Sequence, residues 1–117
     1  MRGLTVLVAA ADPARFHAAL SLAAAQAALG GRARIYLHGE SVGLLGPAAE
    51  DARYAGAGMP GIAELRTEVA ALGVSIIACQ SGFVLAGLSH GDVAPDVEAG
   101  GLIGLLSDLG EDRLVVV

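Results

Sequence analysis

The sequence predicts an α/β protein: a three-layer α/β/α sandwich around a mainly parallel, five-stranded sheet. Three observations lead to this prediction. Apolar runs of strand length alternate with helical stretches along the whole chain. The first run is continuously apolar, as in strands that are covered on both faces. Neither an internal repeat nor a linker interrupts the 117 residues, so we expect a single domain that covers 1–117.

Hydrophobic spacing and helix-stopping residues define the expected elements. In chain order they are a strand at 4–10, a helix at 13–29, a strand at 33–38, a helical turn at 42–45, a helix at 62–73, a strand at 74–79, a helix at 81–88, a strand at 96–100, a helix at 102–110 and a strand at 113–117. Between the turn and the next helix, residues 47–60 have several glycines and few apolar anchors. We expect them to form the most mobile loop of the chain.

Two of these helices have clear boundaries and an apolar stripe. Asp12 can cap the first one, Pro13 suits its first turn, and Gly30 with Gly31 ends it. Its inner face, by the spacing of three and four, consists of Phe16, Leu20, Ala23 and Ala27. The inner stripe of the helix at 62–73 consists of Ile62, Leu65, Val69 and Leu72.

The composition argues against several classes of partner. The formal net charge is −5, and the chain has seven arginines, no lysine and few aromatic residues, so no nucleic acid is expected. No apolar stretch approaches the roughly 20 residues that a membrane-spanning helix needs. The first apolar run ends too early for a secretory signal and predicts a strand instead. A single cysteine cannot form an internal disulfide, which favours a reducing, cytoplasmic compartment.

The motifs of nucleotide and metal sites are missing. The first strand–helix turn, AAADPAR, has neither GxGxxG nor GxxxxGK[ST], and the chain has no GxSxG. The glycines of GAGMPG at 56–61 do not follow a strand, so we interpret them as a flexible loop. His17, His38 and His90 are too scattered for metal-ligand spacing. We therefore predict no metal and no cofactor.

Cys79 is the residue whose position indicates chemistry. It is the last residue of the strand at 74–79, on the carboxyl edge of the sheet, where ligands gather in parallel sheets. Gln80, Ser81 and Gly82 begin the next helix, and their free backbone N–H groups would favour the nucleophilic thiolate. The alternative is a cysteine that only fills a hole in the core, because free cysteine is among the most buried residue types.

The same edge of the sheet supplies the expected polar neighbours of this thiol. Asp12, His38 and Ser41 all follow the ends of neighbouring strands. A nearby His38 ring could promote the thiolate, although a solvated histidine at a strand end is the alternative. We predict a partly accessible sulfur at the floor of a cleft that these strand ends form.

The first helix carries a signal about assembly. From residue 14 to 29 its polar residues are only Arg15, His17, Ser21 and Gln26. A helix on the surface of a monomer usually shows a broader polar face, although alanine also tolerates exposure. We expect this helix to be partly buried between subunits of a homo-oligomer.

Four segments, taken in order, carry a family resemblance. They are ADPARFHAALSLAAAQAALGG after the first strand, ARIYLHGESVGLL, then GIAELRTEVAALGVSIIACQSGFVLAGL with its cysteine, and finally DVEAGGLIGLLSDLGEDRLVVV. Their order and spacing resemble the DsrE/DsrF-like family, which includes the TusD-type sulfur-relay proteins. The resemblance covers essentially the whole chain.

The resemblance implies a function as well as a fold. It implies a parallel α/β/α sandwich that assembles into homo- or hetero-oligomers, with a trimer and a hexamer as open alternatives. It also implies that Cys79 carries sulfur as a persulfide between donor and acceptor proteins, with Gln80 to Gly82 stabilising the anion. The chain would then be a sulfurtransferase or a component of a sulfur relay.

The chain departs from this family at two positions. Some members have a second cysteine where this chain has Gly82, so an intramolecular disulfide step is excluded here. Some have an arginine where Ala86 precedes Gly87. Two hypotheses follow: a persulfide carrier that acts through Cys79, or a non-catalytic oligomer on the same fold that binds a small molecule or serves as a scaffold, with a structural cysteine.

Overall fold

A five-stranded sheet forms the centre of the structure, a computed structural model that describes residues 1–46 and 52–117. The strand order is β4-β3-β2-β1-β5, and every neighbouring pair is parallel. The strands are β1 (Leu4–Val8), β2 (Ala33–Leu37), β3 (Ser75–Cys79), β4 (Val97–Gly100) and β5 (Arg113–Val116). The predicted parallel five-stranded sheet is confirmed.

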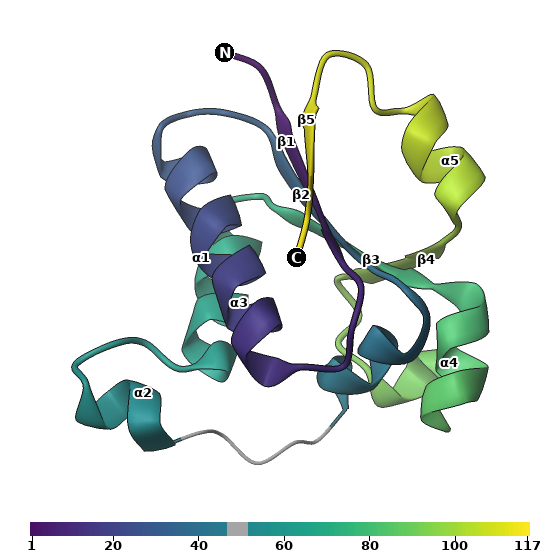
Figure 1. The fold of residues 1–117 in the computed structure, drawn as a ribbon, viewed down its shortest axis with the longest axis horizontal. Coiled ribbons are helices and arrows are strands. Elements are labelled where there is room, and N and C mark those ends of the chain that lie inside the picture. Colours follow the sequence, from purple (N-terminus) through teal and green to yellow (C-terminus); the bar gives the residue numbers. More distant parts are fainter. Residues whose placement is uncertain (47–51) are drawn as a thin grey trace.

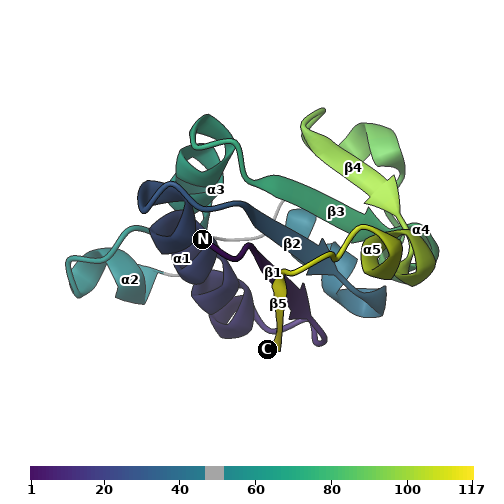
Figure 2. The same ribbon diagram turned by 90° about the horizontal axis from the view of Figure 1, so that it is seen from above.

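Helices lie on both sides of this sheet, which confirms the three-layer architecture. The α-helices are α1 (Pro13–Ala28), α2 (Ala52–Gly56), α3 (Ile62–Ala71), α4 (Gln80–Ala86) and α5 (Leu102–Ser107). Two short 3₁₀ helices, η1 (Gly39–Leu45) and η2 (His90–Asp92), complete the set. Figures 1 and 2 show α1 beside α3 on one face, with α4 and α5 on the other.

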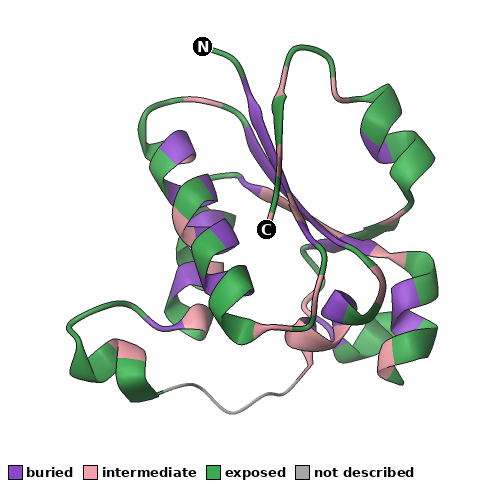
Figure 3. Ribbon diagram, in the orientation of Figure 1, coloured by how far each residue is buried: buried purple, intermediate pink, exposed green. Residues whose placement is uncertain are grey.

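The main hydrophobic core lies between the sheet and the helices α1 and α3. Its largest fully buried side chains include Phe16, Leu20, Ile35, Leu37 and Val69, and the buried residues follow the inner side of both helices in Figure 3. The predicted stripe of α1 is buried except at its end, where Ala27 is only partly buried. In α3 the stripe ends earlier than predicted, because Leu72 is the exposed C-cap residue, where the helix turns toward β3.

The predicted loop at 47–60 contains a helix, α2. Residues 47–51 of that prediction lie outside the described residues. In α2 the ring of Tyr54 stacks on the ring of His17 of α1, with centroids 3.9 Å apart and planes 3° from parallel. The same histidine ring also contacts the Pro60 carbonyl oxygen at 2.9 Å. His17 therefore holds this segment against α1, a tertiary contact that local composition does not reveal.

The predicted helical turn and the helix after Cys79 both occur with shifted boundaries. The turn expected at 42–45 is η1, which begins three residues earlier. The helix expected at 81–88 is α4, which begins at Gln80 and ends at Ala86 because Gly87 adopts a left-handed conformation with φ 67°. The two elements pack against each other at the carboxyl edge of the sheet.

Candidate functional site

Cys79 lies where β3 ends and α4 begins, as the sequence indicated. Its side chain is partly exposed. In the parallel register Cys79 pairs with Gly100 of β4. This cysteine is therefore neither sealed in the core nor fully exposed, a position that suits a thiol that must meet a partner.

The backbone N–H groups that lower the pKa of Cys79 come from two elements. They belong to Gly39 at the start of η1 and to Gly82 and Ser81 of α4. Gly39 has φ 56°, a left-handed conformation that glycine adopts without steric cost. We call the N–H groups of these three residues, Gly39, Ser81 and Gly82, the Cys79 cradle.

Gly82 is the residue that allows the cradle to form. A Cβ atom built on Gly82 would overlap the Gly39 carbonyl oxygen and the side chain of Val42. Any side chain at this position would therefore push α4 away from η1. The second cysteine that some DsrE/DsrF-like proteins carry here would not fit this packing.

Tyr36 is the fourth group that lowers the pKa of Cys79. It lies on β2 opposite Ile77 of β3, so the alternation of strand side chains places it on the same face as Cys79, two residues further along. The Tyr36 side chain is fully buried, and its hydroxyl has no hydrogen-bond partner among the described residues. Burial, together with the neighbouring Cys79, raises the pKa of Tyr36 to about 12.

These surroundings favour the thiolate. Burial by itself would raise the pKa of Cys79, because a thiolate loses solvation there. The three N–H groups of the cradle and the Tyr36 hydroxyl outweigh burial, so the pKa of Cys79 is lowered below its ordinary value. No charged side chain of the described residues is among the interactions that set this pKa. The site is an anion cradle built from neutral donors.

The residues predicted from sequence divide into two groups. Ser81 and Gly82 contact the sulfur through their backbone, whereas Gln80 is exposed and has no recorded contact with it. Their role in binding a sulfur species stays a prediction. Sequence reasoning missed Gly39 and Tyr36, although strand alternation and an in-register pairing of β2 with β3 would have placed Tyr36 on the cysteine's face.

The other three predicted neighbours make interactions elsewhere. The Asp12 carboxylate accepts from the Ala14 N–H at 3.0 Å and thereby caps α1. The Ser41 hydroxyl donates to the carbonyl oxygens of Val8 at 2.9 Å and His38 at 2.8 Å. His38 is exposed, and its ring centroid lies 6.3 Å from that of Tyr36. None of these recorded interactions reaches Cys79, so a binding role for the three residues stays a prediction.

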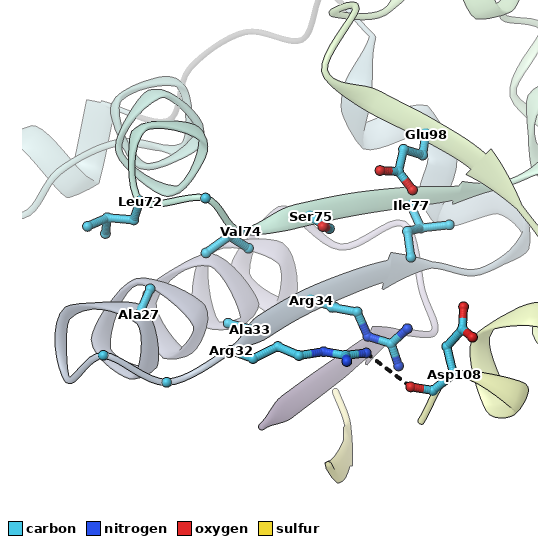
Figure 4. Close-up of a pocket in the computed structure, with 13 residues that line it drawn as sticks. Ala27, Arg32, Ala33, Arg34, Leu72, Val74, Ser75, Ile77, Glu98 and Asp108 are labelled. Atoms are coloured by element: carbon cyan, nitrogen blue, oxygen red, sulfur yellow. Dashed lines mark hydrogen bonds between the residues drawn. The ribbon is translucent and has the colours of Figure 1, made fainter. Parts of the chain in front are cut away.

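Three cavities among the described residues are not lined by Cys79, so the predicted cleft has no counterpart in them. The one of about 640 Å³ lies at the amino ends of β2 and β3 and is lined by Arg32, Arg34, Ser75, Glu98 and Asp108, among others. Figure 4 shows Arg32 donating to the Asp108 carbonyl oxygen, a hydrogen bond of 3.0 Å.

Two features are absent from the described residues. These residues contain no group of three or more histidine, cysteine or carboxylate side chains that could hold a metal ion. None of their helices has the length and apolar character needed to span a membrane.

Comparison with solved structures establishes the fold. The ychN protein from E. coli matches over 100% of both chains with a TM-score of 0.71 and 17% sequence identity. MTH1491, a protein of unknown function from Methanobacterium thermoautotrophicum, matches over 100% of both chains with a TM-score of 0.74 and 16% identity. This chain shares the fold of both proteins. At these identities the likeness shows the fold alone. No family model and no curated protein matches the sequence.

Proposed function

We propose that this chain is a cytoplasmic sulfur carrier that holds sulfane sulfur as a persulfide on Cys79. The observation that carries the proposal is the convergence of three N–H donors and the Tyr36 hydroxyl on a partly exposed sulfur. A thiolate is the form that attacks and leaves in sulfur exchange, and these donors lower the pKa of Cys79. The shared DsrE/DsrF-like fold is compatible with this role.

Two exchange steps make up the reaction. The Cys79 thiolate attacks the outer sulfur of a donor persulfide, RS–SH; the S–S bond breaks, RS⁻ leaves, and Cys79 now carries the S–SH group. An acceptor thiolate then attacks that outer sulfur, and the Cys79 thiolate leaves. Each step exchanges one S–S bond for another, so no external oxidant or reductant is needed. With no second cysteine in the chain, both partners must bring their own thiols.

Mass spectrometry of the intact protein tests the proposal. The purified protein is incubated with a small persulfide such as glutathione persulfide, and we expect one added sulfur atom, about 32 Da, that is lost on reduction. The Cys79→Ser variant should fold normally and take up none. A wild-type protein that never loads, and whose cysteine is alkylated only after unfolding, would support the alternative of a scaffold with a structural cysteine.

A further inference from the structure

We propose that Tyr36 is a positioning residue for Cys79: its hydroxyl donates a hydrogen bond to the sulfur in the thiolate form, and so stabilises Cys79 as a leaving group. The part of this inference that concerns sulfur delivery rests on the proposed function. The part that concerns the thiolate does not, because it involves only the side chains of Tyr36 and Cys79.

The buried hydroxyl of Tyr36 is costly for the fold. The Tyr36 side chain is fully buried, and its hydroxyl has no hydrogen-bond partner in the described part of the chain. A buried hydroxyl without a partner destabilises a fold, and phenylalanine would fill the same space without that cost. Cys79, on the same face of the neighbouring strand, is the one side chain that contributes to the raised pKa of this tyrosine. Packing of the core does not require the Tyr36 hydroxyl, whereas a hydrogen bond to the Cys79 sulfur would explain its presence.

The proton lies on the Tyr36 hydroxyl when Cys79 is a thiolate. The pKa of Tyr36 is raised to about 12, so its phenol stays protonated, while the pKa of Cys79 is lowered. Tyr36 is thus the donor and the sulfur the acceptor. Other titratable groups on the surrounding elements are Glu40 of η1 and Glu98 of β4, together with the exposed His38. None of them is among the interactions that set the pKa of Cys79.

The hydroxyl then acts in a particular step. In the loaded protein the inner sulfur of Cys79 is bonded to the outer sulfur and carries little charge. When an acceptor thiolate attacks the outer sulfur, the S–S bond breaks and its electron pair moves to the inner sulfur. A hydrogen bond to that atom strengthens as the charge develops, and a leaving thiolate of lower pKa departs faster. Tyr36 should therefore favour delivery of the sulfur.

The test compares two tyrosine variants, because the chain has only Tyr36 and Tyr54. Tyr36→Phe removes the hydroxyl at the site, whereas Tyr54→Phe removes one from a ring of α2 that stacks on His17 of α1. The readout is the rate of Cys79 alkylation by iodoacetamide as a function of pH in the native protein. We expect Tyr36→Phe to raise the midpoint by about one pH unit, a tenfold loss of thiolate at neutral pH, and Tyr54→Phe to leave it unchanged.

Stability and sulfur delivery complete the test. Tyr36→Phe should unfold at the same urea concentration as the wild type or at a higher one. If Tyr36 had only a structural role, the variant would unfold at a lower urea concentration and its alkylation rate would keep the pH dependence of the wild type. Delivery from a preloaded Cys79 persulfide to a small thiol should slow about threefold. If the wild type never loads but the alkylation midpoint still shifts, the proposed function fails and the Tyr36 contact stands.

An unchanged alkylation midpoint in Tyr36→Phe would overturn the inference. If that variant does not fold, 3-fluorotyrosine incorporated into the Tyr54→Phe protein provides the second measurement, because Tyr36 is then the one labelled residue. The fluorinated phenol is a stronger donor, so the midpoint should move to lower pH. A midpoint that stays in place would again overturn the inference.

Discussion

At the scale of single residues, the site depends on what is absent from position 82. The missing side chain of Gly82 lets α4 approach η1 closely enough for both to donate N–H groups to the Cys79 sulfur. This explains why a cysteine on an ordinary strand end gains a lowered pKa without any neighbouring cation. Gly82 is therefore a component of the site, although it contributes no side chain.

A substitution at Gly82 should therefore affect both stability and the thiol. Gly82→Ala would place a methyl group against the Gly39 carbonyl and Val42, and we expect a loss of about 1–3 kcal/mol in the free energy of unfolding. Because the cradle opens, the pKa of Cys79 should also rise. Urea unfolding and the pH dependence of alkylation measure the two effects.

Gly104 of α5 is the matched control, because a Cβ atom there would have no neighbour within 4 Å. Gly104→Ala should stabilise the helix by up to about 1 kcal/mol and leave the thiol unchanged. Equal effects of the two substitutions would contradict the role given to Gly82.

At the scale of elements, a buried polar cluster holds β5 in the sheet. Asp112, just before β5, accepts from the Thr5 hydroxyl of β1 at 3.0 Å and lies 3.7 Å from the Arg34 guanidinium of β2. The side chains of Arg34 and Asp112 are only 8% and 7% exposed. Arg32 also approaches this carboxylate, at 3.4 Å, but its side chain is 52% exposed. One carboxylate thus connects two central strands to the start of the edge strand.

Removing that carboxylate should destabilise the protein strongly. Asp112→Ala leaves the Arg34 guanidinium buried without its anion, and we expect a loss of about 3 kcal/mol or more. Arg32→Ala removes an exposed partner of the same carboxylate and should cost less than about 1 kcal/mol. Thermal or urea unfolding of the two variants checks this difference. Similar losses in the free energy of unfolding would contradict a larger contribution from the buried pair of Arg34 and Asp112.

The same elements show how far the sequence alone could lead. Hydrophobic runs and glycine stops placed all five strands and the helices α1 and α3 within a few residues, because these signals are local. The helix α2 was missed, since it depends on Tyr54 stacking on His17. Tyr36 was missed because its contact with Cys79 exists only once β2 and β3 pair in register. Local sequence signals do not predict features that depend on contacts between segments far apart in the chain.

At the scale of the whole molecule, the described residues leave apolar surfaces uncovered in the single chain, and two of them concern assembly. The exposed side of α1 consists mostly of alanine and leucine, as the sequence pattern indicated. Two of the polar residues of this helix, His17 and Gln26, are buried and contact the carbonyl oxygens of Pro60 and Arg2. The second surface lies on the α5 side of the sheet. There Leu114 and Val116 of β5 are 43% and 61% exposed, and Ile103 of α5 is 86% exposed.

These surfaces lead to a prediction about assembly. Parallel sheets are normally covered on both faces, so the open strand face favours a second copy of the chain as its cover. Light scattering at micromolar concentration should give a mass above the 11.6 kDa of one chain. Val116→Glu should reduce it to the monomer, because the carboxylate would be buried unpaired. Leu22→Glu tests α1, the interface that the sequence predicted: if it alone produces monomers, α1 is the contact. A monomeric wild type would contradict both surfaces as interfaces between copies.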